Sequence, residues 1–479
     1  MATTADPKPL APTVDAAMAK ARAAQAKFAS CSQQQVDQAV TAIAWSIYRP
    51  ENAARLAQLA VDATGLGNRD DKVTKNRRKT FGTLRDLMRA RTVGVIDDDP
   101  NRGLTRYAKP VGIVAAITPS TNPAATPINK AMMAIKGGNA IVMAPSPSGW
   151  TTTNEAVCLA REELEKVGAP PDLIQVLPQP VTREITEDLM RAADLVVATG
   201  SQNNVRRAYK SGKPAIGVGA GNVPVIIDAT ADLADAAEKI ALSKTFDNAT
   251  SCSSENSLII VDAIYEQAVD ALVSSGAHRA SDSEAARVVN GLFPNGNLDR
   301  TYIAKDYPVL RKAFGLDGTD QDRYVLVEEP APGSDRPMTG EKLALVLTVY
   351  RARDFDHAVE LTSQVLDVQG IGHSVGIHTA NENHARQLAE SLPVVRVLVN
   401  QAHTFGNGGS FDNALPFTLT MGCGTWAGNS ISENLNINHF INITHLVRTI
   451  EPDEPDEAEL FADHWALTGY HPGMSSNDN

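Results

Sequence analysis

The chain has 479 residues, of which 43% are hydrophobic, and its 44 basic and 56 acidic side chains give a formal net charge of -12. This length exceeds what a single core supports, so we expect two or three domains. The sequence has no basic block of nucleic-acid-binding type, no apolar run long enough to cross a membrane and no secretory signal pattern at its start. We therefore expect a cytoplasmic protein with neither a nucleic-acid nor a membrane partner.

Four cysteines, Cys31, Cys158, Cys252 and Cys423, are scattered along the chain without the CxxC or CxxH spacing of a metal site. In a chain of this size, scattered cysteines favour free thiols in a reducing compartment over a disulfide framework. The sequence also lacks an HxxxH pattern, so we expect no metal.

The chain begins with a helical pattern and continues as an alternation of strands and helices. Residues 13–90 have apolar side chains at helical spacing. From residue 105, short β-branched runs predict strands at 111–117, 140–144, 173–177 and 195–198, separated by helices. A second pattern of this kind occupies residues 246–435, with strands near 257–261 and 343–349. Strands that alternate with helices in this way predict parallel, doubly wound α/β sheets.

A dinucleotide-binding fold usually carries a GxGxxG motif after its first strand. The run Gly217 to Asn222 looks similar, but its spacing differs and no helix follows it, so a glycine-rich turn explains it better. The turn Thr199 to Ser201 follows a predicted strand and opens a helix, where free backbone N–H groups favour a pyrophosphate. A capped surface helix explains this turn equally well.

Four segments resemble the aldehyde dehydrogenase superfamily, and within it the CoA-acylating branch. They are TPSTNPAATPINKAMMAIKGGNAIVMAPSP (118–147), ATGSQNNVRRAYKSGKPAIGVGAGNVPVIID (198–228), SKTFDNATSCSSE (243–255) and MGCGTWAGNSISENL (421–435). The resemblance implies two doubly wound α/β domains and a small oligomerisation arm. It predicts a cofactor-binding domain at 1–245 with an arm near 104–108, a catalytic domain at 246–435 and an oligomerisation strand at 436–450. Residues 451–479 are acidic and polar, so we expect a tail that frays.

By this resemblance, Cys252 is the catalytic nucleophile and Asn122 is the oxyanion donor. Addition of a thiolate to an aldehyde creates an alkoxide, which hydrogen-bond donors must stabilise before hydride can leave. The Asn122 amide and the backbone N–H of Cys252 would supply two such donors. Cys423 is the alternative nucleophile, although in resembling enzymes its segment is structural.

Departure of the hydride would leave the acyl group on Cys252 as a thioester, and a missing residue predicts how that thioester is released. Hydrolytic members of the family carry a glutamate that activates water 34 residues before the cysteine, and here that position is Val218. Valine cannot act as a general base. The resemblance therefore implies transfer of the acyl group to coenzyme A, with hydrolysis to the free acid as the alternative.

The resemblance also implies a nicotinamide cofactor. Glu341 matches the glutamate that binds the nicotinamide ribose, and the remaining candidate cofactor-binding residues are Thr118, Ser120, Ser146, Thr199, Gly200, Ser201 and Gly219. The acidic residue that favours NAD in other members is absent after the second predicted strand. Because a carboxylate there would repel a 2′-phosphate, its absence favours NADP, with NAD still possible.

The stretch 401–413 is expected to line the aldehyde end of the site, and it contains many hydrogen-bond donors and few bulky aliphatic side chains. Such a lining suits a short polar or anionic aldehyde. The stretch resembles that of acylating enzymes that act on sulfoacetaldehyde, with Gln401 and His403 as candidate sulfonate donors. Both residues could instead only fix the loop, and acetaldehyde and succinate semialdehyde remain alternative substrates.

The family resemblance finally implies a homodimer or homotetramer. The segments 104–108 and 438–447 are placed to exchange between subunits, and the second alternates apolar and polar side chains as an added edge strand does.

Overall fold

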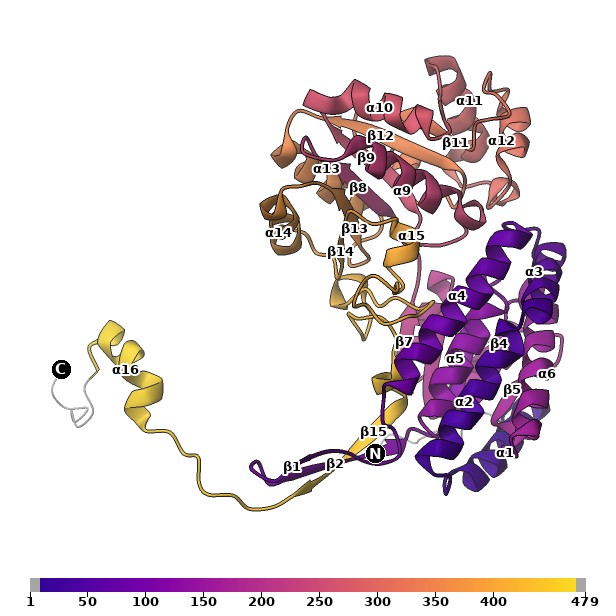
Figure 1. The fold of residues 1–479 in the computed structure, drawn as a ribbon, viewed down its shortest axis with the longest axis vertical. Helices are drawn as coiled ribbons and strands as arrows, with labels where there is room; N and C mark the ends of the chain where they lie inside the picture. The colour runs from indigo at the N-terminus through magenta and orange to yellow at the C-terminus, as the bar shows by residue number, and fades with distance from the viewer. Residues whose placement is uncertain (1–8, 471–479) are drawn as a thin grey trace. The chain divides into compact units, whose positions relative to one another are not determined.

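The computed structural model describes residues 9–470, and its first part is helical (Figure 1). Helices α1 (Pro12–Phe28), α2 (Gln33–Tyr48), α3 (Pro50–Thr64) and α4 (Arg69–Met88) follow one another. Ser32 and Gln35 form a capping box at the start of α2, and Gly65, at φ 65°, ends α3. Helices α2 and α4 pack on each other and on α5 (Ala125–Lys136), which continues the core.

The first sheet has five parallel strands in the order β5-β4-β3-β6-β7. The strands are β3 (Ile113–Thr118), β4 (Ala140–Pro145), β5 (Ile174–Val176), β6 (Leu195–Thr199) and β7 (Ala215–Val218), and α6 (Trp150–Lys166), α7 (Arg183–Ala192) and α8 (Gln202–Lys210) alternate with them. Every residue of β3 and β4 is buried, as a strand covered on both faces requires. From β3, strands β4 and β5 extend the sheet to one side, and β6 and β7 extend it to the other. Such a switch point leaves a crevice at the carboxyl ends of the strands.

The second sheet has seven parallel strands in the order β10-β11-β12-β9-β8-β13-β14. Its strands are β8 (Val223–Ile227), β9 (Glu255–Val261), β10 (Ala277–Arg279), β11 (Tyr324–Glu328), β12 (Val346–Ala352), β13 (Val375–His378) and β14 (Val397–Val399). Its helices are α9 (Leu233–Thr245), α10 (Tyr265–Ser274), α11 (Asp282–Leu292), α12 (Tyr307–Phe314), α13 (Phe355–Val368), α14 (Glu382–Ser391) and α15 (His403–Gly406). The predicted fold class, two doubly wound α/β sheets, is confirmed.

The sheets divide the chain earlier than the predicted domain boundary at residue 245. Strand β8 pairs in parallel with β9, so it belongs to the same sheet as the strand that follows Cys252. The crossing from one sheet to the other therefore falls in the loop 219–222, between β7 and β8. Sequence alternation could not locate this crossing, because strands and helices alternate in the same way on both sides of it.

A three-stranded sheet contains β1 (Gly94–Asp99), β2 (Leu104–Pro110) and β15 (Ile441–Val447). The predicted arm 104–108 lies within β2, whereas the predicted strand at 438–447 begins only at Ile441, after a short 3₁₀ turn. Strand β1 was not predicted, because its sequence GVIDDD lacks apolar alternation.

The tail at 451–479 was expected to fray, and this expectation is wrong for residues 457–468. They form α16 (Glu457–Thr468), where the Asp456 side chain accepts a hydrogen bond from the backbone N–H of Ala458 at 2.8 Å. An aspartate cap followed by good helix formers explains the helix. The last part of the predicted tail, 471–479, lies outside the described residues.

Within residues 9–470, no helix is long and apolar enough to cross a membrane. Within the same range, no group of three or more His, Cys, Asp or Glu side chains is arranged to hold a metal ion.

Candidate active site

Cys252 lies in a short loop between α9 and β9, and the segment before it has an unusual backbone. Asp247, Asn248 and Ala249 have φ values of 50°, 52° and 60°, in the left-handed region that residues other than glycine rarely adopt. All three are buried. Three such residues in succession persist only where the surrounding structure holds them, so their contacts position the cysteine.

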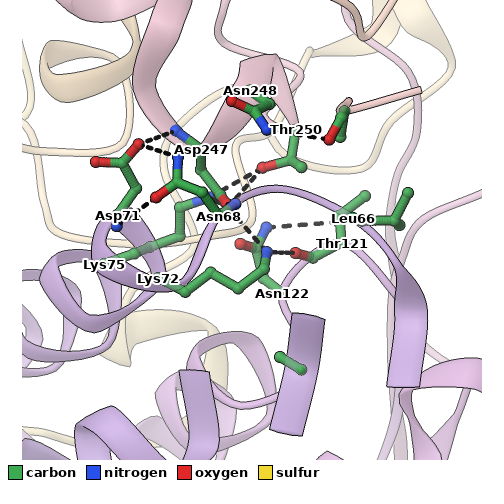
Figure 2. A network of polar contacts seen from close by, with 12 residues as sticks. Leu66, Asn68, Asp71, Lys72, Lys75, Thr121, Asn122, Asp247, Asn248 and Thr250 are labelled. Carbon is green, nitrogen blue, oxygen red and sulfur yellow. Dashed lines mark hydrogen bonds and ion pairs between the residues drawn. The ribbon is translucent and has the colours of Figure 1, made fainter. Parts of the chain in front are cut away.

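The side chain of Asp247 is the centre of these contacts (Figure 2). Its Oδ2 accepts hydrogen bonds from Lys72 Nζ at 3.0 Å, Lys75 Nζ at 2.5 Å and Thr250 Oγ1 at 2.7 Å. Its Oδ1 accepts from the backbone N–H of Asn68 at 3.0 Å. Burial by itself raises the pKa of the Asp247 carboxyl, but the ammonium groups of Lys75 and Lys72 outweigh it and hold the pKa below its usual value.

Lys72 also contacts the loop that carries Asn122. Its Nζ donates to the backbone oxygen of Thr121 at 3.1 Å, one residue before Asn122 (Figure 2). The backbone oxygen of Asn122 accepts from Thr126 N at 3.2 Å, which fixes Asn122 at the start of α5. Lys72 therefore links the loop of the predicted nucleophile to the loop of the predicted oxyanion donor. We missed Lys72, Lys75 and Asp247 in the sequence; the helical spacing of the two lysines was the only signal.

The loop that follows Val218 packs directly against Cys252. A Cβ atom on Gly221 would lie 2.2 Å from the backbone oxygen of Cys252, so this position requires glycine. Glu341 Oε1 accepts from Gly221 N at 3.3 Å, and burial raises the pKa of Glu341 to about 7. Val218 ends β7 with 1% of its surface exposed, and its side chain has no group that could accept a proton from water.

The thiol of Cys252 is protonated in this arrangement. Its burial raises the pKa to about 12, and the nearby Glu341 and Cys423 add to this effect. A hydrogen bond with Ser253 and the charge of Arg396 oppose it.

Because a folded-state pKa near 12 leaves the thiolate a minor species across the neutral range, we expect alkylation of Cys252 by iodoacetamide to rise about tenfold per pH unit. Mass spectrometry resolves the rate at Cys252 between pH 7 and pH 10 in the absence of ligands. A plateau below pH 9 would show instead that the free protein already holds a thiolate.

Cys423, the alternative nucleophile, is enclosed by its own segment. It is 3% exposed, and its Sγ donates to the backbone oxygen of Met421 at 3.5 Å. A Cβ on Gly372 would lie 2.1 Å from the Cys423 backbone oxygen, so backbone covers it closely. Arg396 Nη2 donates to the backbone oxygen of Gly422 at 2.8 Å, beside this thiol. These contacts are those of a structural residue.

Most candidate cofactor residues lie at the carboxyl edge of the first sheet. Thr118 ends β3, Thr199 ends β6, and Ser120, Ser146, Gly200 and Ser201 occupy the turns after these strands and β4. Gly219 follows β7 against the side chain of Gln202. Within the described part of the chain, the buried hydroxyls of Thr118 and Ser146 have no hydrogen-bond partner, whereas Thr199 Oγ1 lies 2.7 Å from Thr420 Oγ1. Unpaired hydroxyls at a switch point suit a dinucleotide.

Gln401 and His403, the candidate sulfonate donors, are both engaged with the protein. Gln401 Oε1 accepts from Asn413 Nδ2 at 2.9 Å, within the same loop. The buried His403 has its Nε2 2.9 Å from Ser374 Oγ, and burial lowers its pKa to about 3, so its ring is neutral. Within the described residues the buried Nδ1 of His403 has no hydrogen-bond partner, so these contacts are compatible with both roles, sulfonate donor and support of the loop. Asn407 of the same loop donates from Nδ2 to Ser253 Oγ at 2.9 Å, which places the loop beside Cys252.

Residues 7–285, more than half of the chain, match the family described as "Aldehyde dehydrogenase family". The chain therefore belongs to the aldehyde dehydrogenase family, and it is an oxidoreductase.

Over 461 residues it is 52% identical to the acylating sulfoacetaldehyde dehydrogenase of Cupriavidus necator, covering 96% of this chain and 94% of that relative. It is 42% identical to the acylating sulfoacetaldehyde dehydrogenase of Bilophila wadsworthia, covering 95% and 99%. The crystal structure of an acetylating aldehyde dehydrogenase from Geobacillus thermoglucosidasius matches with a TM-score of 0.89 at 36% identity, covering 92% of this chain and 98% of that one.

Proposed function

We propose that this protein oxidises sulfoacetaldehyde to sulfoacetyl-CoA, with coenzyme A as acyl acceptor and NADP, or alternatively NAD, as hydride acceptor. The acylating reaction is supported above all by Val218, a buried apolar residue at the position of the hydrolytic glutamate. Val218 ends β7, and the loop that follows it packs against Cys252. Without a general base at this position, water is a poor acceptor for the acyl group, whereas a thiol attacks a thioester readily.

In the proposed reaction, Cys252 releases its proton to solvent, and the resulting thiolate attacks the aldehyde carbon. The resulting oxyanion accepts hydrogen bonds from Asn122 Nδ2 and the backbone N–H of Cys252. The adduct becomes a thioester when its hydride leaves; a bound nicotinamide would accept that hydride, and Thr118, Ser146 and the turn at Ser201 would hold the dinucleotide. The thioester then transfers its acyl group to the CoA thiol, which restores Cys252.

The proposed substrate is supported by the names of the two relatives and by the polar lining of the loop 401–413. Acetaldehyde and succinate semialdehyde are the competing substrates. The preference for NADP is supported by the sequence Ala144-Pro145-Ser146 at the end of β4, which carries no carboxylate to repel a 2′-phosphate.

We expect sulfoacetaldehyde with NADP to give the highest kcat/KM in a panel of the three aldehydes, each measured with NAD and with NADP in the presence of CoA. A tenfold preference for acetaldehyde, about 1.4 kcal/mol of transition-state stabilisation, would overturn the proposed substrate while leaving the acylating reaction intact.

We further propose that the sheet of β1, β2 and β15 joins subunits in a homodimer or homotetramer. Ile443, Leu446 and Val447 of β15 are 46%, 42% and 70% exposed, an apolar edge that a partner strand would cover. Sedimentation as a monomer at micromolar concentration would contradict this proposal.

A further inference from the structure

Helix α4 carries a row of buried cations. Lys72, Lys75 and Lys79 are spaced three and four residues apart, so they share one helix face, and they are only 3%, 5% and 9% exposed. Arg78 adds a fourth positive charge beside Lys79. Four residues of helix span about 6 Å, so Lys79 lies roughly one turn beyond Lys75 along this face.

Only one end of the row is neutralised. Lys72 and Lys75 share the carboxylate of Asp247 (Figure 2). Lys79 Nζ instead donates to the backbone oxygen of Gly408 at 2.7 Å, and Arg78 Nη2 donates to Ser410 Oγ at 2.6 Å. Within residues 9–470, no carboxylate lies within 4.0 Å of either cation in an ion pair.

Aromatic rings, with no carboxylate in an ion pair within residues 9–470, surround Lys79 and Arg78: Lys79 lies over Phe417, and Arg78 lies over Phe411 and Phe405. Burial, together with the charges of Arg78 and Lys75, lowers the pKa of Lys79 to about 7. Arg78 has a buried Nε without a hydrogen-bond partner in the described chain, and the acidic group that acts on it is the exposed Asp412. Burial of a cation such as Lys79 is costly unless an anion joins it.

These cations lie beside the loop of the nucleophile. Lys75 Nζ donates to Thr250 Oγ1 at 3.1 Å, two residues before Cys252. Asn407, the neighbour of Gly408, donates to Ser253 Oγ on the other side of Cys252. Lys79 and Arg78 therefore contact the loop 401–413, which Asn407 joins to the residue that follows Cys252.

We propose that Lys79 and Arg78 bind the anionic group of the aldehyde and determine specificity for it. This inference rests on the proposed function, in which that group is a sulfonate. Sulfonate oxygens accept charge-assisted hydrogen bonds from ammonium and guanidinium groups, and the anion supplies the charge that the site lacks. In this proposal Gln401 and His403, which contact Asn413 and Ser374, support the loop.

The test compares Lys79→Met and Arg78→Met with the unmodified protein, using sulfoacetaldehyde and acetaldehyde, which share a two-carbon chain. Loss of a charge-assisted hydrogen bond should lower kcat/KM for sulfoacetaldehyde about 10- to 100-fold, mainly through KM. The value for acetaldehyde should change less than about threefold, since acetaldehyde carries no anionic group, and Lys79→Arg should retain most activity toward sulfoacetaldehyde. Lys166→Met, at a lysine that is 60% exposed on α6, is the matched control for a lost positive charge.

A second measurement separates this inference from the proposed substrate. Ethanesulfonate should inhibit acetaldehyde oxidation by the unmodified protein competitively, and its inhibition constant should rise at least about tenfold in Lys79→Met. This result would support the anion site even if sulfoacetaldehyde proved a poor substrate. An unchanged inhibition constant, or equal losses with both aldehydes, would overturn the inference and leave Lys79 as a residue that only fixes Gly408.

Discussion

Cys252→Ala is expected to lower the kcat of CoA-dependent aldehyde oxidation by at least about 10⁴-fold, because the variant cannot form a thioester. The substitution removes one sulfur from a loop whose shape is set by Asp247 and its lysine partners, so the fold should survive. A thermal unfolding midpoint within about 5 °C of the unmodified protein would confirm this, since one kcal/mol corresponds to only a few degrees in a chain of this size.

Cys423→Ala is the matched control for this prediction. Cys423 is enclosed by backbone at Gly372, and its Sγ is used in a contact with Met421, so its loss should leave a readily measurable fraction of the activity. Comparable losses from the two substitutions, measured by NADPH formation with the same aldehyde, would contradict the assignment of Cys252 as the sole nucleophile.

The fold was predictable because the strands of its two sheets are short apolar runs that alternate with helices along the chain. The buried strands β3 and β4 are continuous apolar runs, and their register follows from parallel pairing between successive βα units. The crossing after Val218 was not predictable, because the alternation of strands and helices does not change there. Helix α16 was missed because its acidic composition concealed an aspartate cap and a run of good helix formers.

Part of the candidate site was likewise predictable from the sequence, and part was not. Family resemblance picks out Cys252 and Asn122 from their segments, but the bond that links their loops joins Lys72 to Asp247, 175 residues apart in sequence. The state of His403 was also hidden, because it depends on Ser374 and on burial that no local pattern reveals. Which polar side chains are buried together is a property of the folded packing, and this explains why the sequence did not identify Lys72, Lys75 and Lys79 as a buried row.

The acylating reaction depends on what Val218 cannot do. In the proposed cycle, oxidation of the aldehyde ends at a Cys252 thioester, and a second nucleophile must release the acyl group. The loop 219–222 follows Val218 and packs on Cys252 through Gly221. Its sequence, Gly-Ala-Gly-Asn, contains no carboxylate or imidazole that could replace the missing base. A single kinetic experiment distinguishes transfer of the acyl group to CoA from its hydrolysis.

Stopped-flow measurement of NADPH formation, with and without CoA, tests the acylating reaction most directly. Without CoA we expect a burst close to one NADPH per active site, followed by a steady rate at least about 100-fold below that with CoA, because water lacks a general base. Mass spectrometry of the stalled protein should find the acyl group on Cys252. Sustained turnover to the free acid without CoA would contradict the account and establish a hydrolytic enzyme.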